Sequence, residues 1–223
     1  MTDPLPGPTP TSLPTGAAVT SLHEHLLATP GWPADTRALP APEEPLVHWI
    51  GVNHRFNGLL WAEEDLARRT RVADSEIAAN KRAIDRFNQA RNDATERVDE
   101  LLLVALGLVD AQSAHTDSPV TRATPGSRLN SETAGSMIDR LSILSLKLRA
   151  MREQCARADA DEAHRALSRG RLTQLERQRG DLAACLDALL ADARAGRAHF
   201  KVYRQFKMYN DARFNPALQA EQG

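Results

Sequence analysis

The distribution of proline constrains the fold of this chain more than any other feature of its sequence. Ten of the thirteen prolines lie before residue 46. Proline interrupts helices because it lacks a backbone N–H and its ring clashes with the preceding turn. Residues 1–20 are therefore expected to form an extended or disordered tail, residues 21–29 a short amphipathic helix, and residues 30–45 a wrapping loop. Residues 46–215 are expected to form a single helical domain, followed by a short tail at 216–223.

The residues after 45 have the apolar spacing of long helices. Apolar side chains recur with a period of about 3.5–3.6 residues, in stretches at about 44–71, 75–106, 131–158 and 162–195. Aromatic residues make up only 4% of the chain, a composition that favours helix over sheet. The expected fold is all-α, an antiparallel bundle of about four long helices. Residues 107–130 contain Gly and Pro among polar residues and are expected to form a long connection or a lid.

The C-terminal residues 199–211 differ in composition from the rest of the chain. They interleave aromatic side chains with cations, and such a pattern can stack a base or a sugar. The plainer interpretation is that aromatic side chains anchor this tail across the bundle. The second interpretation is favoured, and both remain open.

Charge and composition exclude several classes of protein. The formal net charge is −1, so no strong field directs the chain to nucleic acid or to an anionic membrane. No apolar run approaches the ~20 residues of a membrane span, and the N-terminus lacks the pattern of a signal peptide, so a cytoplasmic location is expected. Cys155 and Cys185 have no metal-ligand spacing and are expected to be free thiols.

One stripe of polar residues crosses the first long helix. Its members recur at steps of 3, 4, 3 and 4 residues, and they are His54, Asn57, Trp61, Glu64 and Arg68. This spacing places them on one face over about four turns, roughly 21 Å. Because a large aromatic lies in its middle, the stripe is expected to be at least partly buried. Buried polar groups need partners, which either other helices or a ligand must supply.

Known catalytic motifs are missing from the sequence. Glu63, Glu64 and Asp65 are consecutive and point about 100° apart on a helix, so they cannot share one ion. Carboxylate-bridged di-iron bundles use Glu-x-x-His motifs, and none occurs here. The chain also lacks a Gly-x-Ser-x-Gly elbow and a phosphate-binding Gly-x-x-x-x-Gly-Lys-Ser/Thr loop. No metal or cofactor is therefore expected, and whether the chain is an enzyme stays open.

Four segments give the chain a resemblance to a known bacterial family. They are HRFNGLLWAEEDLARR at 54–69, EIAANKRAIDRFNQARND at 76–93, LNSETAGSMIDRLSILSLKL at 129–148 and YRQFKMYNDARFNP at 203–216. In these segments the chain resembles the family catalogued as domain of unknown function 4254. The resemblance implies no established chemistry. It implies a context, because family members are often encoded near glycosyltransferases of surface-polysaccharide assembly.

The polar residues of the stripe and of the next two helices suggest a ligand-binding pocket. The stripe is expected to face polar residues of the next two helices and to form a pocket, closed by residues 107–133 or by the aromatic tail. His54 and Glu64 would move a proton, and arginines would clamp an anion. The expected ligand-binding residues are Arg55, Asn57, Trp61, Arg68, Asp85, Asn88, Arg91, Asn92, Asp139 and Arg140. Contact of Glu64 with Arg82, Arg91 or Arg140 would support this pocket.

Three functions remain open from the sequence. The first is a binding protein or enzyme for an anionic or sugar-like small molecule of surface-polysaccharide assembly. The second is a non-catalytic helical adaptor for a glycosyltransferase, and long amphipathic helices also permit a homodimer. The third is a chorismate-mutase-like enzyme on a small dicarboxylate, because such enzymes bind their substrate between helices. In the competing structural interpretation, the carboxylates of Asp85 and Asp139 form interhelical ion pairs that fix helix register.

Overall fold

The structure is a computed structural model, and it describes residues 12–205, 208 and 211–220. Its helices are α1 (Gly16–Ala28), a 3₁₀ turn η1 (Thr36–Ala38), α2 (Pro45–Leu66), α3 (Asp74–Ala105), α4 (Ala111–Ala114), α5 (Ala134–Ala156), α6 (Glu162–Arg194) and α7 (Pro216–Ala220). The strands β1 (Arg128–Leu129) and β2 (Ala198–His199) form one short parallel pair. The expected all-α class is confirmed.

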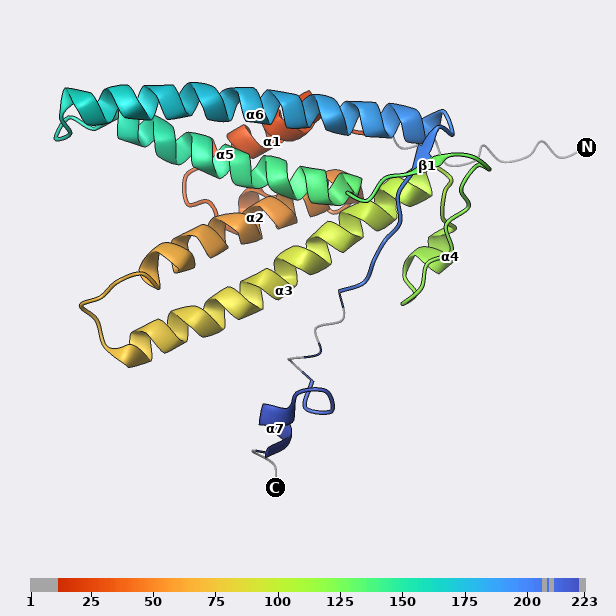
Figure 1. Cartoon of the computed structure of the whole chain (residues 1–223), viewed down its shortest axis with the longest axis horizontal. Coiled ribbons are helices and arrows are strands. Elements are labelled where there is room, and N and C mark those ends of the chain that lie inside the picture. Colours follow the sequence, from red (N-terminus) through yellow and green to blue (C-terminus); the bar gives the residue numbers. More distant parts are fainter. Residues whose placement is uncertain (1–11, 206–207, 209–210, 221–223) are drawn as a thin grey trace, which may run out of the picture.

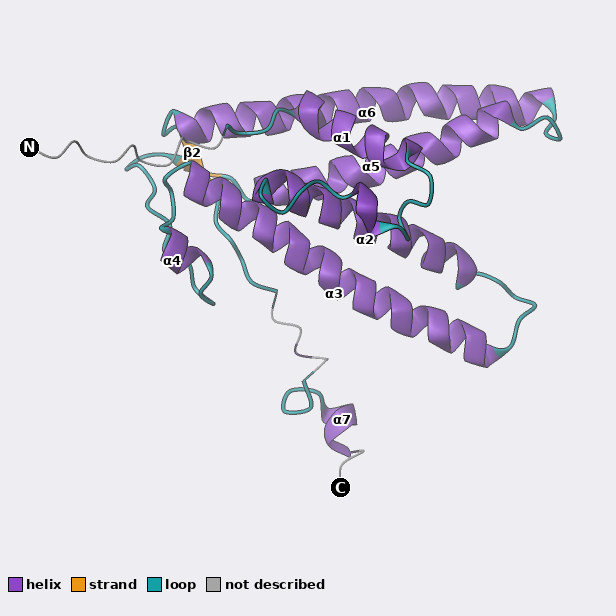
Figure 2. Ribbon diagram, turned by 180° about the vertical axis from the view of Figure 1, so that it is seen from behind, coloured by secondary structure: helices purple, strands orange, loops and turns teal. Residues whose placement is uncertain are grey.

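Two long helical hairpins make up the body of the protein (Figure 1). Helices α2 and α3 form one hairpin, and α5 and α6 form the other. Helix α5 joins them, because it packs against α2 and α3 as well as α6. Helix α1 lies across α5, α6 and α2, behind the hairpins in Figure 1 and in front of them in Figure 2. In both views the hairpins diverge with distance from the strand pair.

The main core lies where α3, α5 and α6 converge near the strands. Leu102 of α3, Leu141 of α5 and Leu186 of α6 are each 0% exposed, and each lies on the apolar stripe of its helix. Removing a side chain of this size from water contributes about 1.5–3 kcal/mol. Phe200, directly after β2, is also fully buried in this core. The start of the C-terminal tail is thus anchored to the bundle by an aromatic side chain.

Several helix boundaries agree with the sequence signals. The Thr133 side chain accepts from the Ser136 amide, and the Asp161 side chain accepts from the His164 amide, so each caps its helix close to the expected start. Gly196 follows α6 with φ +69°, a left-handed conformation that suits glycine. Helix α6 runs unbroken through Gly170 and Gly180.

Two boundaries differ from the expectation. Helix α1 begins at Gly16 rather than at residue 21, so residues 16–20, expected in the tail, are its first turn. Thr15 caps this helix by accepting from the Ala18 amide, and Val19 is buried in the main core. Helix α2 ends at Leu66 rather than near residue 71, because the backbone tightens there into i→i−3 hydrogen bonds at Arg68 and Arg69.

Residues 107–130 contain short α4 and strand β1, two elements that the sequence did not predict. Both are too short for periodicity to reveal. Among the described residues, no helix combines the length and the apolarity needed to cross a membrane. Residues 1–11 of the expected tail, and Phe206, Lys207, Tyr209 and Asn210 of the aromatic tail, lie outside the described residues.

Candidate ligand-binding site between α2, α3 and α5

A cluster of buried polar side chains joins α2 to α5. The Asp139 carboxylate accepts from the amides of Asn53 and Asn57, each at 2.8 Å. Asn57 also donates to the Ser142 hydroxyl at 3.0 Å, and Asn53 donates to the Thr95 hydroxyl of α3 at 3.0 Å. These groups satisfy one another, as polar groups in the interior must; Asn53, Asn57 and Ser142 are buried, and the Asp139 side chain is 16% exposed. We refer to Asn53, Asn57, Thr95, Asp139 and Ser142 as the Asp139 network.

His54 extends this network toward α1. Its Nδ1 lies 2.7 Å from the Ser142 hydroxyl, and its ring stacks on His23 with centroids 4.4 Å apart and on Trp32 at 5.8 Å. Both ring nitrogens of His23 and Nε2 of His54 are buried without a hydrogen-bond partner in the part of the chain described here. Burial lowers the pKa of His54 to about 4 and also lowers the pKa of His23. Both imidazoles are therefore neutral at pH 7.

This burial predicts a specific acid sensitivity. Between pH 6.5 and about 4 the unfolded chain takes up a proton at residue 54 that the folded chain does not, so the free energy of unfolding falls as the pH falls. The contribution of His54 amounts to about 3 kcal/mol, at ~1.4 kcal/mol per pKa unit. In urea titrations from pH 7 to 4, the wild type should lose more stability than His54→Gln. Parallel pH profiles for the two proteins would contradict the assignment.

A pocket of about 320 Å³ opens beside the Asp139 network. It lies between α2, α3 and α5, on the side where the hairpins diverge. Its lining residues are Asn57, Leu60, Trp61, Glu64, Asp65, Arg68, Asn88, Arg91, Ile143 and Leu146. We refer to it as the Trp61 pocket.

Arg91 links the Trp61 pocket to the buried network. One terminal nitrogen donates to Asn92 Oδ1 at 2.9 Å, and another lies 4.0 Å from the Asp139 carboxylate. Its Nε is buried and has no hydrogen-bond partner among the described residues. The Arg91 side chain is 26% exposed. A partly exposed guanidinium with a loose ion pair retains donor capacity for an anion.

The other charged groups of the pocket lie closer to solvent. Arg68 and Glu64 form an i,i+4 ion pair at 3.0 Å, with side chains 69% and 46% exposed. Exposed pairs of this kind stabilise a helix by only ~0.3–0.5 kcal/mol. Both side chains can therefore turn toward a ligand at little cost.

The structure gathers many of the expected site residues and separates others. Asn57, Trp61, Glu64, Arg68, Asn88 and Arg91 line the pocket. His54 and Asp139 lie next to it in the buried network, and His54 itself is 0% exposed. Asn92 is buried on α3, where it donates to Gln205 at 2.8 Å.

Several expected contacts are wrong. Asp85 is exposed and pairs with Lys81 one turn away, since it lies on the outer face of α3. Arg140 pairs with Glu132 on the other side of α5, and Arg55 donates to the Pro33 carbonyl in the loop before α2. Glu64 pairs with Arg68 and not with an arginine of α3 or α5. Neither residues 107–133 nor the described part of the C-terminal tail lines the Trp61 pocket.

Asn53 and Ser142 are network members that the sequence reasoning missed. Asn53 lies one turn before Asn57, so the stripe extends further toward the N-terminus than its assigned start. Ser142 is a small polar residue among the apolar positions of α5 and is 0% exposed. A polar residue on an apolar stripe is the signal that would have identified it.

Comparison with known proteins identifies the family. A family model described as a protein of unknown function (DUF4254) matches residues 47–202. The chain belongs to the DUF4254 family. No curated protein and no solved structure matches the chain. The DUF4254 match extends from α2 through β2 and contains every residue of the Asp139 network and of the Trp61 pocket.

The described part of this DUF4254 protein offers no group of three or more His, Cys, Asp or Glu that could hold a metal ion. Cys155 and Cys185 are free. The polar groups of the Trp61 pocket are thus two guanidinium groups, two side-chain amides, the carboxylates of Glu64 and Asp65, and an indole ring. These groups can bind and orient a polar ligand.

Proposed function

We propose that this DUF4254 protein binds a small anionic, hydroxyl-bearing molecule in the Trp61 pocket. The observation that carries the proposal is Arg91, whose buried Nε has no acceptor among the described residues and whose guanidinium lies 4.0 Å from the nearest carboxylate described. Buried donors are normally satisfied, and a phosphate or carboxylate at this position would accept from Arg91. Arg68 at the rim adds a second positive charge for the same anion.

The rest of the lining favours a ligand that carries a ring. Trp61 presents an indole face on which a sugar or base can stack. A second hollow of about 230 Å³ lies on the other side of Trp61, lined in part by Trp32, Pro33 and Arg149. The two hollows together would hold a ligand larger than a simple sugar phosphate. With the surface-polysaccharide context that the family resemblance implies, sugar phosphates and nucleotide sugars are the first ligands to test.

Binding is better supported than catalysis. His54, expected to move a proton, is fully buried, so it orders the network rather than meeting a ligand. Glu64 alone among the proposed catalytic residues lines the pocket. The chorismate-mutase-like alternative needs two cations for a dicarboxylate, and Arg68 with Arg91 would supply them. A small dicarboxylate therefore belongs in the same ligand panel.

Ligand-induced thermal stabilisation tests this proposal. Inorganic phosphate, glucose 1-phosphate, UDP-glucose and prephenate are added at millimolar concentration, and Tm is followed. At least one should raise Tm by several degrees, since a ligand at 100 Kd contributes about 2.7 kcal/mol. Arg68→Gln should reduce the shift at least severalfold without changing the Tm of the free protein. Arg157→Gln, which removes an exposed arginine paired with Asp159, is the matched control. A panel with no shift, or an equal shift in Arg68→Gln, would refute the proposal.

The adaptor alternative depends on an exposed apolar surface. Among the residues that the structure describes, the exposed large hydrophobic side chains lie on several separate elements: Leu66, Val120, Leu129, Leu167, Tyr203, Met208 and Phe214. A groove of about 690 Å³ between α5 and α6 has both apolar and charged lining residues, among them Leu144, Leu182, Lys147 and Asp181. Neither feature is the contiguous apolar face that an adaptor needs, so the binding function is favoured.

A further inference from the structure

A further pocket has Asn92 in its lining and shares no residue with the Trp61 pocket, and nothing in the proposed function uses it. Its volume is about 280 Å³. Its walls are α3, the first turn of α5 with the residues before it, and the C-terminal segment 202–205. The lining residues are Asn92, Thr95, Glu96, Asp99, Ser131, Thr133, Ser136, Val202, Tyr203, Arg204 and Gln205. We refer to it as the Asp99 pocket.

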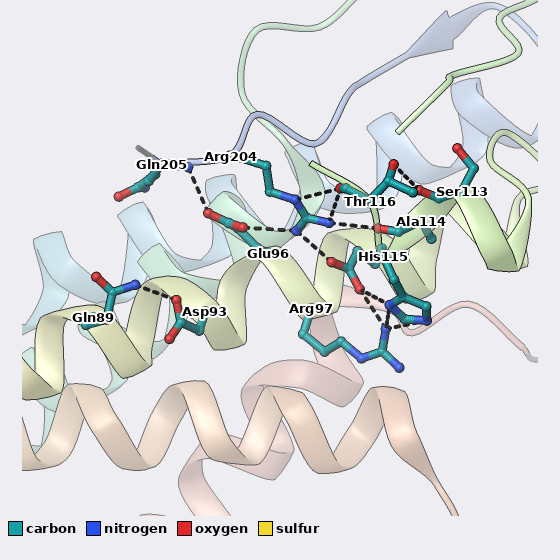
Figure 3. Close-up of polar contacts among 11 residues, drawn as sticks. Gln89, Asp93, Glu96, Arg97, Ser113, Ala114, His115, Thr116, Arg204 and Gln205 are labelled. Carbon is teal, nitrogen blue, oxygen red and sulfur yellow. Dashed lines mark hydrogen bonds and ion pairs between the residues drawn. The ribbon is translucent and has the colours of Figure 1, made fainter. Parts of the chain in front are cut away.

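Arg204 holds the C-terminal segment over this pocket (Figure 3). Its Nη1 donates to Glu96 at 3.0 Å and to Glu100 at 2.6 Å. The same guanidinium donates to the carbonyls of Ala114 and Thr116, at 2.8 and 3.0 Å. One side chain therefore ties the segment both to α3 and to α4. The wall of the pocket is fixed in position by charge-assisted hydrogen bonds.

The charges around the pocket are almost fully compensated. Glu96 accepts from Arg204 and from the Gln205 amide, and Glu100 accepts from Arg204 and Arg97. Asp99 is different, because within the described residues no ion pair involves it. Its Oδ1 accepts from the Gly135 amide at 2.6 Å, and the residue is 4% exposed.

The protonation of Asp99 suits an uncharged partner. Burial raises the pKa of the Asp99 carboxyl to about 7, although the Thr133 hydroxyl and the Gly135 amide act in the opposite direction. Near neutral pH the group exchanges between a neutral acid, which can donate, and a carboxylate, which can accept. A hydroxyl group can pair with either form, because it both donates and accepts.

We propose that the Asp99 pocket binds an uncharged polyhydroxylated ligand, with the chemistry of a monosaccharide, and that Asp99 hydrogen-bonds one of its hydroxyls. The lining supplies four aliphatic hydroxyl side chains, two side-chain amides and two carboxyl groups, all of which match hydroxyl groups. An anionic ligand is disfavoured by Glu96 and Asp99, and a cationic one by Arg204. Tyr203, 59% exposed, adds an aromatic face for the C–H surface of a sugar ring. The volume is at the small end for ligand sites.

Saturation-transfer NMR on the full chain tests the proposal, with glucose, galactose, mannose and N-acetylglucosamine as the probes at millimolar concentration. At least one sugar should receive saturation. Tyr203→Ala should weaken its binding at least about fivefold, and Asp99→Asn about tenfold, because the amide nitrogen of Asn cannot accept from a sugar hydroxyl. Asp99→Asn keeps an oxygen that can accept from Gly135, and Tyr203 is exposed, so both variants should fold. Far-UV circular dichroism of both variants checks that they fold.

Two controls separate this site from nonspecific contact. Leu167→Ala removes an apolar side chain on α6 that is 54% exposed and should leave sugar binding unchanged. Arg157→Gln, which removes an exposed arginine paired with Asp159, should also leave it unchanged. The proposal is overturned if none of the four sugars receives saturation, if the folded Tyr203→Ala binds like the wild type, or if putrescine receives saturation and the sugars do not.

Discussion

Asp139→Ala is expected to lower the free energy of unfolding by about 3 kcal/mol, because it leaves two buried donors without their shared, largely buried acceptor. The carboxylate accepts from two buried amides, those of Asn53 and Asn57. Alanine leaves both donors without this acceptor in the interior between α2 and α5. It also removes the nearest carboxylate to Arg91, at 4.0 Å. Several unpaired groups would thus result from one substitution.

Urea titration at pH 7 measures this loss, with an unchanged m-value as evidence that the unfolding transition stays comparable. Asp85→Ala is the matched control, because it deletes the same side chain from an exposed ion pair with Lys81. It should cost less than about 1 kcal/mol. Equal effects of the two substitutions would mean that the Asp139 network is open to water, and that the distinction between buried network and exposed face is incorrect.

The polar stripe on α2 could be read from the sequence because helix geometry alone places its members on one face. The division of the stripe into a buried half and an exposed half could not be read from the sequence. Asn57 is 4% exposed while the Arg68 side chain is 69% exposed, since α2 and α5 diverge along their length (Figure 1). Divergence of two helices is a property of tertiary packing and leaves no periodic signal in either segment. Four members of the stripe line the Trp61 pocket, whereas His54, to which the sequence assigned proton transfer, is 0% exposed.

Asp99 and Arg204 show a second limit of sequence reasoning. An acid such as Asp99, between apolar neighbours of a helix, can be buried or can lie at the edge of the apolar stripe, and periodicity does not distinguish the two. Its environment is set by Gly135 and by residues 202–205, which are distant in sequence. The family match ends at residue 202, so Arg204, which holds the wall of the Asp99 pocket, lies just beyond it.

Gly135→Ala is the second substitution with a large expected effect. A Cβ at this position would lie 2.7 Å from the Thr95 carbonyl oxygen and 2.8 Å from Cγ of Asp99. The carbonyl belongs to the backbone of α3 and cannot rotate away, so the first turn of α5 must move. Overpacking of this kind costs about 1–3 kcal/mol, and the strained Gly135–Asp99 hydrogen bond adds to it. The expected loss is about 3 kcal/mol.

Gly180→Ala also replaces a helical glycine, but it is expected to raise the free energy of unfolding. Gly180 lies within α6, and a Cβ there would meet nothing within 4 Å. Alanine should raise the free energy of unfolding by about 0.5–1 kcal/mol, because glycine loses more backbone entropy in a helix. Thermal or urea unfolding measures the change in the free energy of unfolding for both variants. If Gly135→Ala were also stabilising, α5 would not approach α3 this closely.

The two glycine variants also separate stability from the geometry of the sites. Both pockets have walls from α3 and α5, and Gly135 sets how closely these helices approach at the Asp99 pocket. A folded Gly135→Ala protein should therefore lose sugar binding in the Asp99 pocket more than anion binding in the Trp61 pocket, which lies further along the helices. Gly180→Ala should leave both unchanged, because α6 lines neither pocket. Equal loss at both sites would mean that the helices shift as one rigid unit.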